Sequence, residues 1–367
     1  MPSCHFVHLI LLSSGPKVPK SGPFKNEGIH EGYNVNTSIN QLVSAIHQNQ
    51  ADCLVQDFDF DTGRQNQMLF IVKPGVFLIQ EPKLIEETCR FMGERIDAFG
   101  LETRGCYVMS AETLKANEIM DRHYGYINRL SRAASSLLSI IEKAEVRKLC
   151  SASDSTPVLG GHEVLAKFRD LSAQALDEIW ASKKSLRVRS GFYVQSYDIS
   201  GEALVIANGF HPFQLERFTG SGRKIALLLL SSDLPWKLLR VRMLGDTFPE
   251  RAAPGSIRGE MHRDPERFGF KSVTISNNAA HLSAGPFEAV FELSNFLSAV
   301  PGLNFEIGIT RQAQHFKSQG LSVSDLRRAI DNPSACIANA KPAIPLFDAT
   351  EEFDAQSGTA VFRKFFF

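Results

Sequence analysis

Residues 68–75, with the sequence MLFIVKPG, form an apolar run that ends abruptly at a Lys-Pro-Gly triplet. The run is short and rich in β-branched and aromatic residues, so it predicts a buried strand followed by a turn. Residues 81–99 then place apolar side chains at helical spacing, with Gly100 just beyond them. This spacing predicts an amphipathic helix that ends at a glycine, with a second strand after it at 101–109.

The rest of the core alternates further strands and helices. A helix capped by Ser110 is expected to run towards His123-Tyr124, and another to start at Pro286, because a proline suits the first position of a helix. Further strands are expected at 225–230, 238–243 and 272–275. The order of elements predicts an α+β fold, in which an antiparallel sheet has helices packed on one face.

Residues 131–204 differ from their surroundings and look inserted. Helical patterns at 133–149 and 162–180 flank a stretch rich in Ser, Asp, Pro and Gly, and two strand-like runs at 192–197 and 203–207 close the segment. We expect an N-terminal extension (1–65), a core (66–300) interrupted by this insertion, and a C-terminal extension (301–367).

The two extensions carry few signals of their own. Residues 6–12 (FVHLILL) lack a preceding basic stretch and are too short to span a bilayer, so we interpret them as a buried strand rather than a cleaved signal. Residues 13–35 are interpreted as a loop or linker, and residues 322–330 as a short amphipathic helix. The tail ends in three phenylalanines, so we expect it to cover the core or to form a contact in a homo-oligomer.

Charge and cysteine usage exclude several classes of partner. The chain has 40 Lys and Arg against 40 Asp and Glu, and its formal net charge is zero. Binding along a nucleic acid or a membrane surface draws on an excess of basic residues, so neither is expected as a partner. The six cysteines are scattered, with no CxxC pair and no cluster at zinc spacing. We expect a reduced, cytoplasmic protein without a protein-held metal.

Several familiar catalytic motifs are missing from the sequence. Neither GxxxxGK[ST] nor GxGxxG after a strand occurs, so a P-loop kinase or a dinucleotide-binding enzyme has no support. Ser283 lacks the pair of flanking glycines of a nucleophile elbow, and taken alone it is interpreted as a loop serine.

Three segments remain that gain meaning only when they are taken together. Residues 240–260 read RVRMLGDTFPERAAPGSIRGE, and residues 277–285 read NNAAHLSAG, with Glu292 eleven positions after His281. The third segment is the strand-end lysine, Lys73. They combine clustered cations with a histidine and a carboxylate at fixed spacing.

This set resembles the nucleoside diphosphate kinase family. The run LGDTFP…PGSIRGE is close to the family's nucleotide-binding signature, and N-x-x-H followed by the glutamate resembles its active-site signature. The resemblance implies a ferredoxin-like antiparallel sheet and a phosphotransferase that moves the γ-phosphoryl group of a triphosphate to a diphosphate through a phosphohistidine. It also implies ATP and nucleoside diphosphates as substrates, with Mg²⁺ carried by the nucleotide.

The resemblance also assigns roles to single residues. His281 matches the nucleophile and Glu292 the carboxylate that orients its ring, while Tyr124 matches the tyrosine flanking the catalytic histidine. Lys73 matches a phosphate contact close to the reaction, and Phe213 the aromatic on which the base stacks. The other expected nucleotide contacts are His211, Arg240 or Arg242, Thr247, Arg258, Asn278 and Ser283.

Elementary chemistry is consistent with these roles, although the sequence departs from the family pattern. A neutral imidazole is a competent nucleophile, and a neighbouring carboxylate stabilises its phosphorylated form. However, KPG stands in place of KPDG, Leu282–Gly285 replaces Gly-Ser-Asp-Ser, and His211 replaces an arginine. The alternative is therefore a nucleotide-binding regulatory or scaffold module with little turnover.

Overall fold

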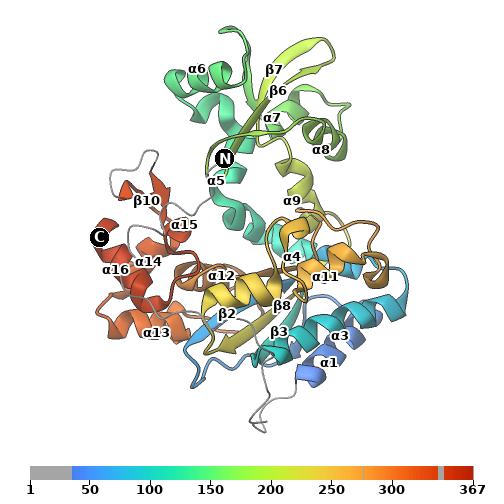
Figure 1. The fold of residues 1–367 in the computed structure, drawn as a ribbon, viewed down its shortest axis with the longest axis vertical. Helices are drawn as coiled ribbons and strands as arrows, with labels where there is room; N and C mark the ends of the chain where they lie inside the picture. The colour runs from blue at the N-terminus through green and yellow to red at the C-terminus, as the bar shows by residue number, and fades with distance from the viewer. Residues whose placement is uncertain (1–34, 276, 338–342, 367) are drawn as a thin grey trace. The chain divides into compact units, whose positions relative to one another are not determined.

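A five-stranded antiparallel sheet carries the elements that surround the candidate site (Figure 1). The computed structural model describes residues 35–275, 277–337 and 343–366. The strands are β1 (Cys53–Gln56), β2 (Asn66–Val72), β3 (Glu102–Ser110), β8 (Lys224–Ser232) and β9 (Ala280–Leu282). Their order is β1-β3-β8-β2-β9, so β2 lies between β8 and the short edge strand β9. The last four have the order of a split βαβ unit, and the expected α+β class is confirmed.

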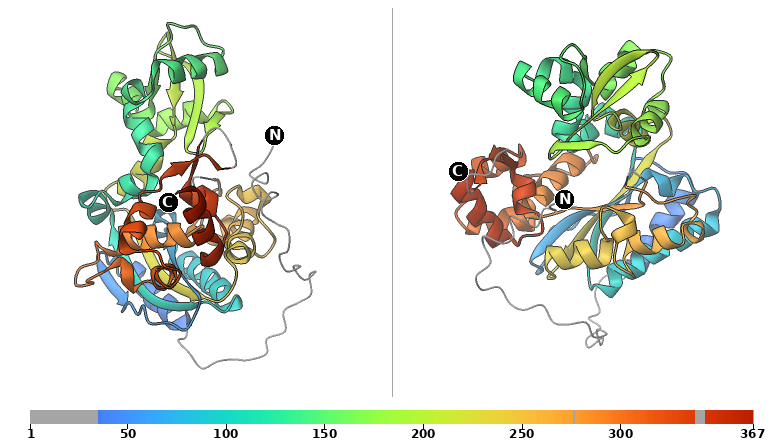
Figure 2. Two further views of the ribbon diagram at one scale, coloured as in Figure 1. Left: turned by 90° about the vertical axis from the view of Figure 1, so that its left-hand side faces the viewer. Right: turned by 45° about the horizontal axis from the view of Figure 1, so that its top comes forward.

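Helices cover both faces of this sheet. Met68, Phe70 and Val72 of β2 pack with α1 (Val35–His47) and α3 (Pro82–Ala98), which lie side by side (Figures 1 and 2). Leu69 and Ile71 point to the opposite face. That face is covered by α4 (Ala111–Ala116), α5 (Ile119–Leu137), α9 (His211–Thr219) and α12 (Pro286–Leu297). The expectation of helices on one face is therefore wrong, and burial on both faces explains why the strand sequences are apolar without alternation.

A second sheet lies between α5 and α9 in the chain. It contains β4 (Val158–Gly160), β5 (Leu186–Arg189), β6 (Phe192–Ile199) and β7 (Glu202–Ala207), in the order β4-β7-β6-β5. Its helices are α6 (Ile140–Leu149), α7 (Gly161–Lys167) and α8 (Ala173–Ala181). Each of the two long helices expected here is divided, because Ser139 and Ser172 cap new helices inside them. The bounds expected for the insertion and the extensions stay predictions.

The C-terminal part packs onto α12 and has its own apolar core. Its elements are η5 (Ile307–Ile309), α13 (Arg311–Ser318), α14 (Val323–Ile330), β10 (Ser334–Ala335), β11 (Ile344–Pro345), α15 (Leu346–Thr350) and α16 (Ala355–Phe365). Phe287 of α12 stacks on Phe316 of α13 with ring centroids 4.3 Å apart. The short helix expected at 322–330 is confirmed, with Ser322 as its cap.

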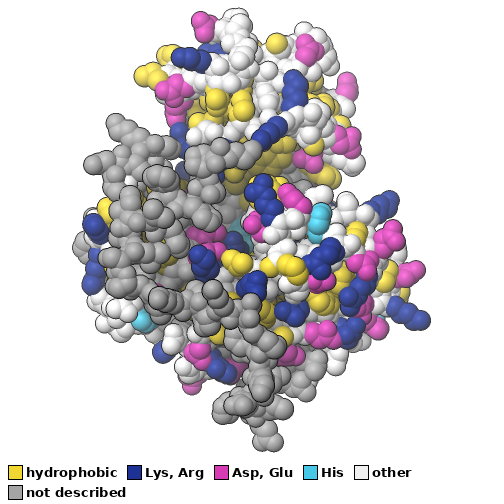
Figure 3. All heavy atoms as spheres, in the orientation of Figure 1, with side chains coloured by type: hydrophobic (Ala, Val, Ile, Leu, Met, Phe, Trp, Pro, Cys, Tyr) yellow, Lys and Arg dark blue, Asp and Glu magenta, His cyan; other side chains and the backbone are white. Residues whose placement is uncertain are grey.

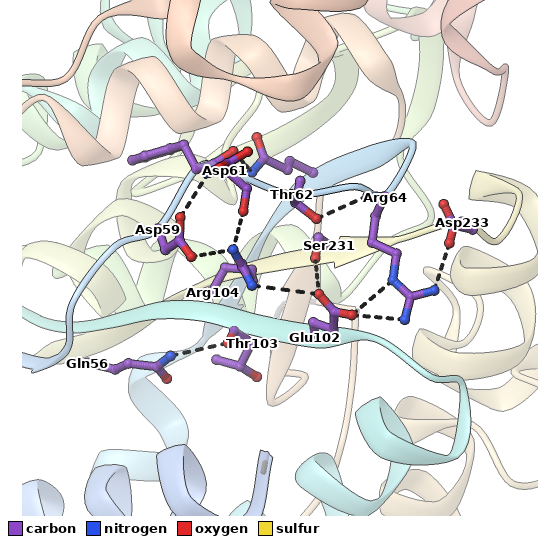
Figure 4. Close-up of polar contacts among 12 residues, drawn as sticks. Gln56, Asp59, Asp61, Thr62, Arg64, Glu102, Thr103, Arg104, Ser231 and Asp233 are labelled. Carbon is purple, nitrogen blue, oxygen red and sulfur yellow. Dashed lines mark hydrogen bonds and ion pairs between the residues drawn. The ribbon is translucent and has the colours of Figure 1, made fainter. Parts of the chain in front are cut away.

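Ion pairs connect the segment before β2 to the start of β3 and to the residues after β8 (Figure 4). Glu102 pairs with Arg64 at 2.9 Å, and Arg64 also reaches Asp233 at 2.7 Å. Arg104 pairs with Asp59. These groups are partly exposed, so each pair is expected to contribute at most about 1 kcal/mol. Elsewhere on the face drawn in Figure 3, acidic and basic side chains are interspersed.

Two of the expected strands are wrong. The segment 238–243 belongs to α10 (Trp236–Leu238) and the π-helical turn η2 (Leu239–Leu244). Leu239, Met243 and Leu244 are its buried residues, at helical rather than alternating spacing. The segment 272–275 is a loop, in which the Asn277 side chain donates to the backbone oxygen of Ser272. Such local side-chain bonds compete with strand pairing.

The remaining short helices are η3 (Pro249–Arg251), α11 (Ile257–Arg263) and η4 (Glu266–Phe268), and α2 (Pro74–Phe77) follows β2 directly. The helix expected after Ser110 is interrupted between α4 and α5, where Glu118 has a φ of 49°. Residues 6–12 and most of the expected linker lie outside the described residues. In the described part of the chain, no helix is both long enough and apolar enough to cross a membrane.

Candidate active site

Strand β9 and helix α12 bring a histidine and a buried carboxylate together. His281 is paired with Ile71 of β2, so both side chains point to the sheet face that α12 covers. His281 Nε2 lies 2.6 Å from Oε1 of Glu292, which is fully buried. The Ser283 hydroxyl donates to the other carboxylate oxygen at 2.6 Å. Both oxygens of Glu292 are therefore engaged.

The charges of this pair set the tautomer of the imidazole. Burial raises the pKa of Glu292, but the charge and hydrogen bond of His281 outweigh it, so the pKa lies below its usual range. An ionised carboxylate only accepts, and His281 Nε2 must therefore carry the proton. Burial lowers the pKa of His281, and Glu292 opposes this only in part. At neutral pH the ring is neutral, with the lone pair on Nδ1.

A second histidine, His123, stands beside this pair. Its Nδ1 is 3.6 Å from Glu292 Oε1, and its ring meets that of His281 edge to face with centroids 5.5 Å apart. Among the described residues Nδ1 has no hydrogen-bond partner, although it is buried. Burial lowers the pKa of His123 to about 4, against the opposing charge of Glu292. One ligand atom from each of these three residues lies within 4.8 Å of the others, a spacing that could hold a metal ion.

Sequence reasoning missed His123 and chose its neighbour. Tyr124 contacts the rings of His123 and His211, with centroids 5.2 and 5.1 Å away, and no ring contact joins it to His281 within the described chain. The adjacent His-Tyr pair was visible in the sequence. Nothing in its spacing indicated which of the two side chains faces His281.

Lys73 and Asn278 form the next part of the site. Lys73 follows β2 and donates from Nζ to Asn278 Oδ1 at 2.6 Å. Asn278 is buried and donates in turn to the backbone oxygen of Ile275 at 2.6 Å. Burial lowers the pKa of Lys73 well below its usual value, and the positive charges of Arg258 and Arg217 add to the effect. An anion beside Nζ would therefore stabilise the charged form of Lys73.

Two arginines are bonded to the outer edge of β9. Arg258 is buried and donates to the backbone oxygens of Gly245 and Ala280, both at 3.2 Å. Arg240 donates to the backbone oxygen of Leu282 at 3.0 Å and to Glu351 Oε1 at 3.1 Å. Burial lowers the pKa of Arg258 to about 9, and Arg240 contributes in the same direction. Both cations lie beside the strand that carries His281.

Other expected contacts lie elsewhere. Arg242 and Thr247 are exposed, and of the two candidate arginines it is Arg240 whose charge acts on His281. His211 is fully buried, and its two ring nitrogens lie 3.1 Å from Gln214 Oε1 and Asn128 Oδ1. Neither nitrogen is left for a phosphate. His211 is a buried residue of α9 that lies between side chains of the protein.

A cavity of about 380 Å³ opens next to Lys73 and Asn278. Phe213 of α9 lines it, and the guanidinium of Arg217 lies over the Phe213 ring at 5.7 Å. Arg217 also bonds to the Asn277 side chain. The full lining is Lys73, Pro74, Gly75, Leu78, Asp177, Phe213, Arg217, Phe218, Arg223, Ser272, Thr274, Asn277 and Asn278. The cavity is therefore lined by both aromatic and cationic side chains.

Comparisons with known proteins give a distant structural likeness. No family profile and no curated protein matches the chain. Among solved structures it is similar to a transition-state mimic of nucleoside-diphosphate kinase from Borrelia burgdorferi with bound vanadate and ADP, at 17% identity and a TM-score of 0.30, over 66% of this chain and 92% of that one. It is also similar to an NDP kinase from Pyrobaculum aerophilum, at 15% identity and a TM-score of 0.29, over 63% of this chain and 94% of that one.

Proposed function

We propose that the protein is a nucleoside diphosphate kinase-type phosphotransferase, with a ferredoxin-like core and His281 as nucleophile. The observation that carries this proposal is the pairing of His281 Nε2 with the buried Glu292, because it leaves Nδ1 as the nitrogen with a lone pair. No described residue hydrogen-bonds to Nδ1, and the His281 side chain is 18% exposed. A neutral imidazole fixed in this way is an activated nucleophile.

The reaction has two displacements. Nδ1 attacks the γ-phosphorus of a nucleoside triphosphate, the bond to the β–γ bridging oxygen breaks, and the diphosphate leaves. A terminal phosphate oxygen of a second diphosphate then attacks the phosphohistidine, the N–P bond breaks, and a triphosphate forms. Glu292 stabilises the positive charge of the phosphorylated ring in both steps.

The surrounding cations are consistent with a phosphate-bearing substrate. Lys73 and Asn278 line the cavity on one side, and Phe213 offers a face on which a base stacks. The cavity lining contains one carboxylate, Asp177, which is too few to form a protein-held Mg²⁺ site. Mg²⁺ would be held by the phosphates of the nucleotide and would reduce their charge.

A labelling experiment tests the proposal. Incubation with γ-labelled ATP and Mg²⁺ should label the wild type in an acid-labile, base-stable form, and His281→Ala should abolish the label. His262→Ala is the matched control, because His262 is exposed and bonds to the Val273 backbone. An unlabelled wild type, or equal labelling of a folded His281→Ala protein, would contradict the proposal.

One observation favours the second candidate, a nucleotide-binding module with little turnover. The guanidinium groups of Arg240 and Arg258 are bonded to backbone oxygens, and Arg240 is also paired with Glu351. Phosphate must compete with these partners. Tight nucleotide binding without a phosphoenzyme, measured on one preparation, would support this candidate over the enzyme.

A further inference from the structure

Asp177 is the carboxylate of the cavity lining, and it comes from α8, in the region between α5 and α9. It is partly buried, and none of the described residues donates a hydrogen bond to it or forms an ion pair with it. Its neighbour Glu178, in contrast, accepts from Gln174 at 3.0 Å. A partly buried acceptor that faces a cavity without a donor is suited to a ligand that brings donors.

Helix α8 is held firmly against the start of α9, and this fixes the position of Asp177. Leu176 and Trp180 are buried on either side of it in sequence. The Trp180 ring lies 5.8 Å from that of Phe210, and its backbone oxygen accepts from the Tyr197 hydroxyl at 2.6 Å. A side chain at Gly209 would meet Trp180 at 2.6 Å, so the two helices approach closely there. A group placed on such a rigid support can select a ligand by geometry.

The residues next to Asp177 define where a base would lie. Helix α9 carries Phe213 and Arg217, which line the same cavity as Asp177. Burial raises the pKa of Asp177, and the charge of Arg217 opposes this and favours the ionised form. The ring of Phe213 supplies a stacking face, whereas Lys73 of the same lining acts with its charge on His281, so in the proposed function the phosphates lie on that side. Asp177 is therefore expected to meet the edge of a stacked base.

We propose that Asp177 recognises the Watson–Crick edge of guanine, so that guanosine nucleotides are the preferred substrates. This rests on the nucleotide site of the proposed function. An ionised carboxylate offers only acceptors. Guanine presents two adjacent donors, N1–H and the 2-amino group, which match the two carboxylate oxygens. Adenine and cytosine each place an acceptor nitrogen beside their amino group, and uracil has one N–H between two carbonyls.

Binding measurements test this inference without relying on catalysis. Dissociation constants for GDP, IDP, ADP and CDP are compared by calorimetry in the wild type, Asp177→Asn and Glu178→Gln. The wild type should bind GDP roughly tenfold or more tightly than ADP, since one bidentate contact discriminates between bases by about that factor. IDP should lie between them, because hypoxanthine keeps N1–H and lacks the 2-amino group.

The two variants separate recognition from nonspecific damage. Asp177→Asn should weaken the binding of GDP and strengthen the binding of ADP. An amide can accept from the 6-amino group of adenine and donate to its N1. Glu178→Gln, next to Asp177 but outside the lining, should keep the wild-type preference. Equal binding of GDP and ADP by the wild type, or an unchanged ratio in Asp177→Asn, would overturn the inference.

The outcomes also separate this inference from the proposed function. A labelled His281 together with equal affinity for GDP and ADP would leave the phosphotransferase standing and overturn the role of Asp177. A guanine preference lost in Asp177→Asn, without any phosphoenzyme, would support Asp177 and contradict the enzyme. If none of the four nucleotides bound, both would be overturned.

Discussion

The Ser283 hydroxyl lies 2.6 Å from Glu292 Oε2 and also accepts a hydrogen bond from the backbone N–H of Leu69 at 3.0 Å. One fully buried side chain, directly after β9, thus connects β2 with α12 and fixes the carboxylate that is paired with His281. Ser283→Ala removes two buried hydrogen bonds, and we expect it to cost about 1–3 kcal/mol in the free energy of unfolding. It should also slow phosphoenzyme formation, because Glu292 loses one of its two anchors.

Urea unfolding and the rate of labelling check this prediction. Ser298→Ala, at the exposed end of α12, is the control and should change neither quantity. A Ser283→Ala protein with wild-type stability would show that Glu292 does not depend on this hydroxyl.

Glu351→Gln should release Arg240 for a phosphate group. The pair is 3.1 Å apart, and the Glu351 side chain is 44% exposed, so its loss should cost at most about 1 kcal/mol of stability. The dissociation constant for nucleotide should fall, because the guanidinium no longer has a competing carboxylate. Calorimetry with GDP measures this, with the adjacent Glu352→Gln as control. Weaker nucleotide binding in Glu351→Gln would contradict the competition.

Phe213→Leu should weaken the binding of all nucleotides to a similar degree. Stacking of a base on an aromatic ring contributes about 1–3 kcal/mol whatever the base, so dissociation constants should rise roughly tenfold or more. Phe213→Trp keeps a stacking face and should retain binding. A loss confined to one base would indicate that Phe213 takes part in base recognition instead of stacking alone.

Acid should destabilise the protein through its buried histidines. Burial lowers the pKa of His211 to about 4, although its bond with Gln214 opposes the shift. Because the unfolded pKa is near 6.5, the unfolded chain takes up a proton below that pH while the folded protein does not. This contribution is fully present above pH 6.5 and is lost as the pH falls towards 4, by roughly 2 kcal/mol at pH 5.

Urea unfolding at pH 7 and pH 5 tests this sign. Between pH 7 and pH 5 the free energy of unfolding of His211→Asn should fall by about 2 kcal/mol less than that of the wild type. This difference does not depend on the stability of the variant at pH 7. The exposed His47→Asn is the control. The same pH dependence in His211→Asn and the wild type would rule out a contribution from His211.

Elements with a strong local signal were predictable from the sequence. The run at 68–72 and the amphipathic stretch at 81–99 correspond to β2 and α3, because burial and helical spacing leave a clear pattern. The alternation of Leu239, Val241 and Met243 was misleading, since Val241 is 42% exposed while Leu244 is buried. In that segment tertiary packing, rather than the local period, decided the structure.

The sequence indicated those residues of the candidate site that stand at the spacing of the signature motifs. His281 is paired with Glu292, and Lys73 with Asn278, whereas the roles that the resemblance implies for these residues stay predictions. His123 was missed, because its approach to Glu292 depends on how α5 packs against α12, which no local pattern encodes. Other contacts that no sequence pattern encodes are the engagement of Arg258 by backbone oxygens and the entry of Asp177 into the cavity.

The bonds of Arg240 and Arg258 to β9 have a consequence for self-association. β9 is an edge strand, and the carbonyls of Ala280 and Leu282 point away from β2, where another chain could pair with them. The two guanidinium groups occupy these carbonyls. Replacing either arginine would expose a template for strand addition three residues long, beside His281. Loss of activity in such variants therefore has to be interpreted together with their state of aggregation, measured by light scattering.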